Sequence, residues 1–93
     1  MSAYSIVRNT SVVRTLQQKL GRRIALLRTR VGITQEMLAE RTSYSVDFIG
    51  LIERGVNAPT LARLKDIADA LSVEVWHLFC PEVMLPKDKS GKK

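Results

Sequence analysis

Cysteine and long apolar runs are almost absent from this sequence, and each absence excludes a class of protein. The one cysteine, Cys80, cannot form an internal disulfide framework, and so low a content is typical of a reducing compartment. No run approaches the roughly 18–20 apolar residues that span a bilayer. The first 13 residues also lack the apolar segment of a signal peptide. We therefore expect a cytoplasmic protein without membrane contacts.

Residues with the spacing that catalysis requires are also lacking. There is no set of serine, histidine and acid, no pair of carboxylates in an apolar setting, no glycine-rich phosphate loop and no metal-ligand spacing. The one histidine, His77, has no second histidine, spaced cysteine or acid cluster beside it, so packing or surface exposure is its expected role. These absences argue against an enzyme and predict neither a cofactor nor a metal.

Aromatic residues make up only 5% of a chain that is 45% hydrophobic, which bears on the fold class. The core of these 93 residues must be built from Leu, Ile, Val, Ala and Met, a composition that suits packed helices in a single domain. We expect an all-α, compact five-helix bundle. Its expected parts are a flexible lead-in (1–13), the helical domain itself (14–80) and a basic, disordered tail (81–93).

Acidic residues are missing from the first 31 positions, which carry seven basic ones. Residues 32–85 carry four basic and eight acidic residues, and the end of the chain from Pro86 is rich in lysine. Two basic zones therefore flank an acidic middle in a chain of net charge +6. Such zones attract a polyanion such as nucleic acid, although a merely solubilising role stays open for the tail.

Apolar spacing and capping residues predict where the helices lie. The first helix is expected from Leu16 to Val31, followed by Gly32 as a left-handed C-cap. Two short helices follow at about 34–41 and 45–53, then a fourth, and a last short one over about Glu74 to Phe79. The expected N-caps are Thr34, Ser45 and Thr60. The fourth helix should turn Leu61, Leu64, Ile67, Ala68 and Leu71 inward.

The second and third helices are joined by a turn of three or four residues. That spacing is the helix-turn-helix arrangement, in which the second helix lies in a DNA major groove while the first crosses the backbone. Ala39 allows the two helices to cross closely, and Ile49 and Ile52 anchor the second one on the core. The side chains left for the outward, base-facing surface are Tyr44, Ser45, Val46, Asp47, Phe48 and Leu51.

The stretch from about Leu20 to Phe79 resembles the Cro/cI-type family of phage repressors, also called the xenobiotic-response-element family. The resemblance implies a lambda-repressor-like DNA-binding domain. It further implies a sequence-specific transcriptional regulator, a repressor that binds a palindromic operator in double-stranded DNA as a homodimer. The matching motifs are Thr34-Gln35-Glu36, Leu38-Ala39, Ile49-Gly50-Leu51-Ile52-Glu53-Arg54-Gly55 and Pro59-Thr60 with Leu64.

The resemblance also implies roles for single residues. Gln35 matches the family's glutamine that binds a backbone phosphate, and Asn57 lies in the loop that meets phosphates with backbone N–H groups. Arg28 and Glu53 match a partly buried ion pair between the first helix and the recognition helix. Three further arginines have no acid nearby, so we favour phosphate contacts over a solvated face for Arg22, Arg23 and Arg30.

The recognition surface departs from the family in its chemistry. Val46 and Leu51 replace the polar base-readers that are frequent there, and Ser43 replaces the turn glycine. Val46 suits a thymine methyl group, while Asp47 is either an acceptor for cytosine N4 or only a charge matched to the helix dipole. We expect phosphate contacts and DNA deformability to carry much of the specificity, unless Tyr44 and Phe48 enter the groove as apolar wedges.

The short apolar C-terminal helix exceeds what a four-helix core needs, so we expect Trp76 and Phe79 at a two-fold dimer interface. The expected partners are a duplex DNA operator and a second copy of the chain, with a toxin or RNA polymerase as alternative protein partners. Two rival functions stay open: a protein-interaction module of the antitoxin kind, and a nucleic-acid binder without sequence preference. A catalytic domain would need a site completed by another chain.

Overall fold

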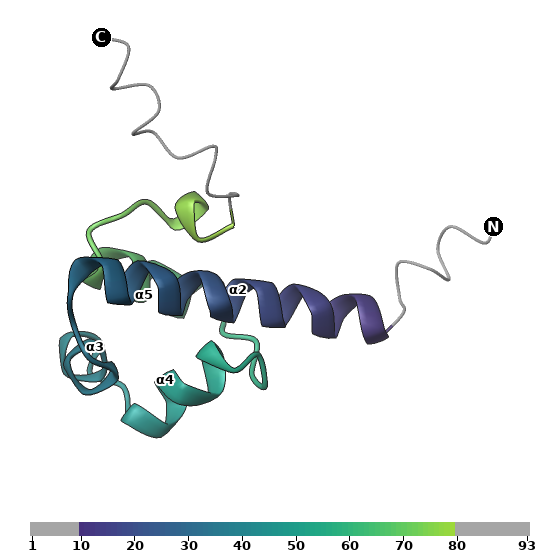
Figure 1. Ribbon diagram of the computed structural model, residues 1–93, viewed down its shortest axis with the longest axis horizontal. Helices are drawn as coiled ribbons and strands as arrows, with labels where there is room; N and C mark the ends of the chain where they lie inside the picture. Colours follow the sequence, from purple (N-terminus) through teal and green to yellow (C-terminus); the bar gives the residue numbers. More distant parts are fainter. Residues whose placement is uncertain (1–9, 80–93) are drawn as a thin grey trace, which may run out of the picture.

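The computed structural model describes residues 10–79 and shows, over that range, four α-helices and one 3-10 helix with no strand. In chain order these are α2 (Thr10–Val31), α3 (Gln35–Thr42), α4 (Val46–Glu53), α5 (Leu61–Ala70) and η1 (Val75–Leu78). In Figure 1 the long α2 crosses the molecule, with α3 and α4 on one side of it and η1 on the other. The all-α class is thus confirmed for this part of the chain, and none of its helices is long and apolar enough to cross a membrane.

The first helix begins earlier than its apolar spacing predicts. It starts at Thr10 rather than Leu16, so residues 10–13 of the predicted lead-in are helical. The apolar spacing does not reveal this part of the helix, because Val12, Val13 and Leu16 are all exposed. A helical turn that buries no apolar side chain leaves no periodic signal in the sequence. The rest of the lead-in (1–9), Cys80 and the tail (81–93) lie outside the described residues.

The predicted fifth α-helix, Glu74 to Phe79, is instead the short 3-10 helix η1. Its backbone bonds join residues three apart: the His77 N–H donates to the Glu74 carbonyl, and the Phe79 N–H to the Trp76 carbonyl, both at 3.0 Å. The Glu74 N–H also donates to His77 Nδ1 at 3.0 Å, which closes the first turn. A segment of four residues is too short to build an α-helical hydrogen-bond ladder, so the described bundle has four α-helices.

Side-chain caps set the boundaries of the three helices that follow α2. The hydroxyl oxygens of Thr34, Ser45 and Thr60 each accept a hydrogen bond from the backbone N–H three residues on, at 3.0, 3.0 and 3.2 Å. These are the predicted N-caps, and each satisfies an otherwise unpaired donor of the first helical turn. In the turn before α4, Ser43 adopts a left-handed φ of 65°, a conformation that glycine adopts without steric cost.

The core lies where α2, α3, α4, α5 and η1 meet. Three residues of the predicted inward stripes are exposed instead: Leu16 in the early part of α2, Val31 as its last residue, and Leu61 as the first residue of α5. Side chains at helix ends project past the neighbouring elements, so the spacing alone overestimates their burial. The buried apolar residues are Ile24, Leu27, Ile33, Leu38, Ala39, Ile49, Ile52, Leu64, Ile67, Ala68, Leu71 and Leu78.

Gly21 marks the point at which α2 crosses the end of α4. A Cβ atom at this position would lie 2.3 Å from the carbonyl oxygen of Ile52 and 2.6 Å from that of Glu53. Both distances are far below van der Waals contact, and both partners are backbone atoms that cannot rotate away. Glycine therefore permits the close α2–α4 contact that holds the helix-turn-helix unit on the long helix.

Candidate nucleic-acid interface

The N-terminal part of α4 presents a small open surface. Ser45, Val46 and Asp47 are exposed, and Leu51, one turn further on, is half-buried. Ile49, on the opposite face, is buried in the core together with Ile52, so the helix cannot rotate about its axis without losing apolar burial. Of the six residues predicted to face bases, Ser45, Val46 and Asp47 are thus exposed at the start of this helix, and Leu51 is partly accessible one turn further on.

The other two, Tyr44 and Phe48, pack against the core between α4 and α5. Their rings meet edge to face with centroids 5.4 Å apart, and the Arg63 guanidinium lies 5.4 and 5.0 Å from the two centroids. The Tyr44 hydroxyl donates to the Asp66 carboxylate, and this hydrogen bond raises the pKa of Tyr44. These contacts hold both rings against α5, so the structure does not place them as wedges for a DNA groove.

Arg28 and Glu53 join α2 to the end of α4. The Arg28 Nε donates to Glu53 Oε2 at 2.7 Å and its Nη2 to Oε1 at 3.2 Å, with side-chain exposures of only 14% and 7%. Arg28 Nη1 also donates to the Ile33 carbonyl at 2.9 Å, and the Gln35 amide donates to Glu53 Oε1 at 2.8 Å. Gln35, predicted to bind a phosphate, therefore keeps one amide hydrogen for such a contact.

The three arginines predicted to bind phosphate differ in exposure. Arg22 and Arg30 are exposed, whereas Arg23 is only 9% exposed and its Nε donates to the His77 carbonyl at 3.0 Å. This bond attaches η1 to α2. The prediction for Arg23 is corrected accordingly: its side chain has a structural role, because its helical position faces η1 rather than solvent.

The loop after α4 offers fewer backbone donors than predicted. The N–H groups of Val56 and Asn57 donate to the Leu51 carbonyl at 2.9 and 3.4 Å, and these bonds close the turn that follows α4. The backbone N–H of Asn57 is therefore already engaged, and its half-buried side chain is what remains for a phosphate contact.

Trp76 and Phe79 are 52% and 57% exposed on η1 and the residue after it. Phe79 lines an apolar groove of about 720 Å³ together with Leu16 and Leu26 of α2. His77 is half-buried with its ring 4.1 Å from that of Trp76, and the described residues contain no cluster of three potential metal ligands. The surface around η1 is thus apolar, as the dimer hypothesis requires.

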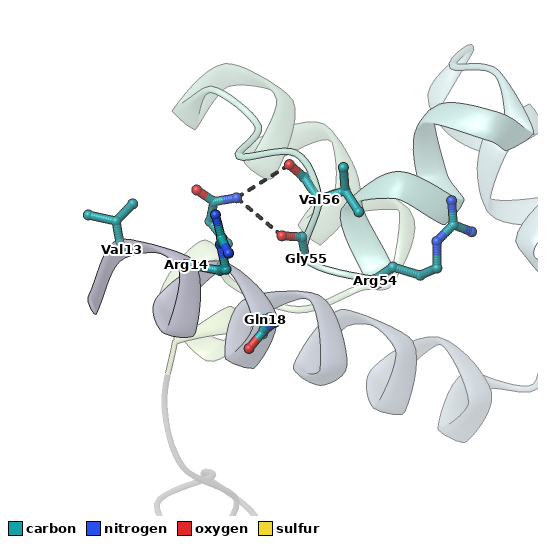
Figure 2. Close-up of a pocket in the computed structure, with 7 residues that line it drawn as sticks. Val13, Arg14, Gln18, Arg54, Gly55 and Val56 are labelled. Atoms are coloured by element: carbon teal, nitrogen blue, oxygen red, sulfur yellow. Dashed lines mark hydrogen bonds between the residues drawn. The ribbon is translucent and has the colours of Figure 1, made fainter. Parts of the chain in front are cut away.

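A polar cleft that the sequence patterns did not predict lies between α2 and the segment after α4 (Figure 2). It is lined in part by Arg14 and Gln18 on α2 and by Arg54 and Val56 after α4. If the helix is taken to begin at Thr10, the spacing of its residues predicts one wall of this cleft. Arg14, Gln18 and Gly21 are four and three residues apart and therefore share the helix face that meets α4.

The family described as helix-turn-helix domain matches residues 19–75 of this chain. A curated relative, an uncharacterised HTH-type transcriptional regulator named YazB from Bacillus subtilis, is 42% identical over 67% of this chain and 90% of its own. The immunity repressor protein of Bacillus phage phi105 is 30% identical over 76% of this chain and 49% of its own. Among solved structures, the restriction-modification controller protein C.AhdI from Aeromonas hydrophila superposes with a TM-score of 0.69 at 33% identity, over 71% and 96% of the two chains.

Proposed function

This chain belongs to the helix-turn-helix domain family of DNA-binding transcriptional regulators, which are not enzymes, and from that premise we propose a sequence-specific repressor that binds a palindromic operator as a homodimer. The observation that carries the proposal is the open N-terminal surface of α4, held in place by a buried opposite face and by the Arg28–Glu53 ion pair. A helix presented in this way fits a major groove. A DNA-binding regulator acts where the DNA is, which for a bacterial or phage protein is the cytoplasm.

Base recognition in this proposal uses few side chains. Val46 contacts a thymine methyl group and Asp47 accepts from cytosine N4, while Ser45 already uses its hydroxyl oxygen as the cap of α4. Leu51 adds apolar contact beside them. With so little hydrogen-bonded readout, sequence-dependent bending of the operator and phosphate contacts supply much of the specificity.

Phosphate contacts come from the exposed cations and amides that flank α4. Gln35 uses its remaining amide hydrogen at the start of α3, and Asn57 uses its side chain in the loop after α4. Arg30 adds positive charge near the end of α2, which carries no acid. Arg22 lines the apolar groove beside Phe79, so its charge attracts the DNA without lying next to α4. These contacts fix the position of the protein on the duplex without reading its sequence.

Dimerisation through the surface around Trp76 and Phe79 would pair two copies of α4. Exposed aromatic side chains beside an apolar groove are typical of an interface, and a two-fold axis requires the same patch on each copy. Two recognition helices then enter successive major grooves about 34–36 Å apart. Repression follows most simply if the bound dimer blocks polymerase. The similarity to an immunity repressor agrees with this role.

Selection of bound sequences from random duplexes tests the proposal. We expect an enriched motif with two-fold symmetry and half-sites about 10 base pairs apart, because two identical helices read successive grooves. Selected pools with no motif would contradict sequence-specific binding and favour the non-specific rival. A single, unrepeated half-site would leave specific binding intact but contradict the dimer.

A further inference from the structure

The first three turns of α2 form one wall of a cleft that is open to solvent. The cleft has a volume of about 430 Å³, and the segment Arg54–Val56 after α4 forms its other wall. The family match begins only at residue 19, so the α2 residues that line the cleft, 13, 14, 17 and 18, precede it. One wall of the cleft therefore precedes the matched helix-turn-helix region, and the other wall lies within it.

The charge of the cleft is positive. Its lining contains two arginines, Arg14 and Arg54, and no acidic residue. Both side chains are exposed, and neither forms an ion pair with any residue that the structure describes. Figure 2 shows the two guanidinium groups apart from each other, with the Gly55–Val56 segment between them. Two separated cations along one cleft suit a ligand with consecutive negative charges better than a single small anion.

The two walls of the cleft are held together by specific contacts. The Gln17 amide donates to the carbonyl oxygens of Gly55 and Val56 at 3.2 and 3.5 Å. Gly55 has a left-handed φ of 78°, and a Cβ atom on it would lie 2.6 Å from the Cα atom of Gln18. The distance between α2 and the end of α4 is therefore fixed, so the backbone positions from which the two arginine side chains extend are set before any ligand arrives.

The cleft also lies at a suitable place relative to the proposed DNA. The base-facing residues are at the N-terminal end of α4, whereas Arg54 directly follows its C-terminal end. When the N-terminal end of a recognition helix enters the major groove, its other end lies nearer the sugar-phosphate rim. A DNA strand passing that rim meets Arg54 first and Arg14 on the wall beyond it.

We propose that this cleft binds the phosphodiester backbone of duplex DNA, with Arg14 and Arg54 each contacting one phosphate of the same strand. The inference rests on the proposed function and extends it: the N-terminal part of α2 lengthens the contact with DNA beyond the reach of the helix-turn-helix unit. Guanidinium groups suit this task because their planar N–H donors match phosphate oxygens. The contact adds affinity for any duplex sequence and does not change the preferred one.

Salt-dependent binding to a fixed duplex tests the cleft, with the single variants Arg14→Ala and Arg54→Ala and the double variant. The plot of log K against log salt has a negative slope, and each lost phosphate contact should reduce the magnitude of that slope by about 0.9 and weaken binding about tenfold at 0.1 M salt. The double variant should lose about twice that slope. Lys65→Ala is the matched control, because this exposed cation lies on α5 and lines neither the cleft nor the apolar groove. Its slope should stay close to that of the wild type.

The possible results separate the two proposals. If the wild type binds duplexes and the double variant keeps the wild-type slope, the cleft does not contact phosphates while the proposed function stands. If both arginine variants lose no more of the slope than Lys65→Ala, the effect is one of general charge and the cleft assignment is wrong. If the wild type fails to bind any duplex at low salt, the proposed function falls and the cleft proposal falls with it.

Discussion

Replacing Gly21 with alanine is expected to destabilise the protein by about 3 kcal/mol, the upper end of what an overpacked core contact costs. On helix propensity alone the same change would stabilise α2 by about 1 kcal/mol. The clash decides the sign, because the new methyl group would lie 2.3 Å from the Ile52 carbonyl oxygen and the two helices must separate. For a domain of this size the loss lowers Tm by about 15 °C, measurable by thermal unfolding.

Gly50→Ala is the matched control for that experiment. Gly50 also lies inside a helix, but its nearest neighbour to an added Cβ is the flexible end of the Arg54 side chain at 3.4 Å. This variant should keep or raise Tm, since only the propensity gain of about 1 kcal/mol remains. A Gly21→Ala protein as stable as Gly50→Ala would show that α2 and α4 do not cross as closely as described.

Arg28→Ala is expected to cost about 3 kcal/mol of unfolding free energy, because it leaves the carboxylate of Glu53 buried without its cation. The pair is almost fully screened from water, with the Glu53 side chain only 7% exposed. The substitution also removes the bond to the Ile33 carbonyl, which holds the turn between α2 and α3. Denaturant unfolding of the variant measures the loss directly.

Adding Glu53→Gln to that variant separates charge from packing. If the unpaired charge causes most of the loss, the second substitution should recover at least about 1 kcal/mol, because a neutral amide is cheaper to bury. No recovery would assign the effect to the lost Ile33 bond and to packing. Lys65→Ala is the control for a surface pair: Lys65 and Asp69 are both more than half exposed, so its removal should leave Tm unchanged within error.

Short-range signals predicted much of this fold. The caps Thr34, Ser45 and Thr60 each accept a hydrogen bond from the backbone N–H three residues on. Because both partners are close in the sequence, the first residues of α3, α4 and α5 could be predicted from it. The start of α2 was missed because the first turns of that helix bury no stripe. The close contact at Gly21 could not be predicted, because its partners Ile52 and Glu53 lie about thirty positions further along the chain.

The exposure of the residues at the start of α4 was predictable from the sequence, whereas the contacts of several neighbouring residues were not. Tyr44 and Phe48 lie at base-facing positions by sequence. In the structure the Arg63 guanidinium packs over both rings and Asp66 accepts a hydrogen bond from Tyr44, so both rings lie against α5. Arg23 is basic like Arg22, yet one residue of helical rotation turns it onto η1. Such outcomes depend on tertiary neighbours, which a linear pattern does not contain.

The exposed residues at the start of α4 are proposed to read base pairs. Selection of bound sequences from random duplexes with the Val46→Ala, Asp47→Ala double variant tests this assignment. Both side chains are exposed and outside the core, so the variant should fold and still bind phosphates. We expect the selected motif to change at the same positions in both half-sites, while binding to unrelated duplexes is not weakened, because no phosphate contact is removed. A variant that selects the wild-type motif would contradict the assignment of this surface to base recognition.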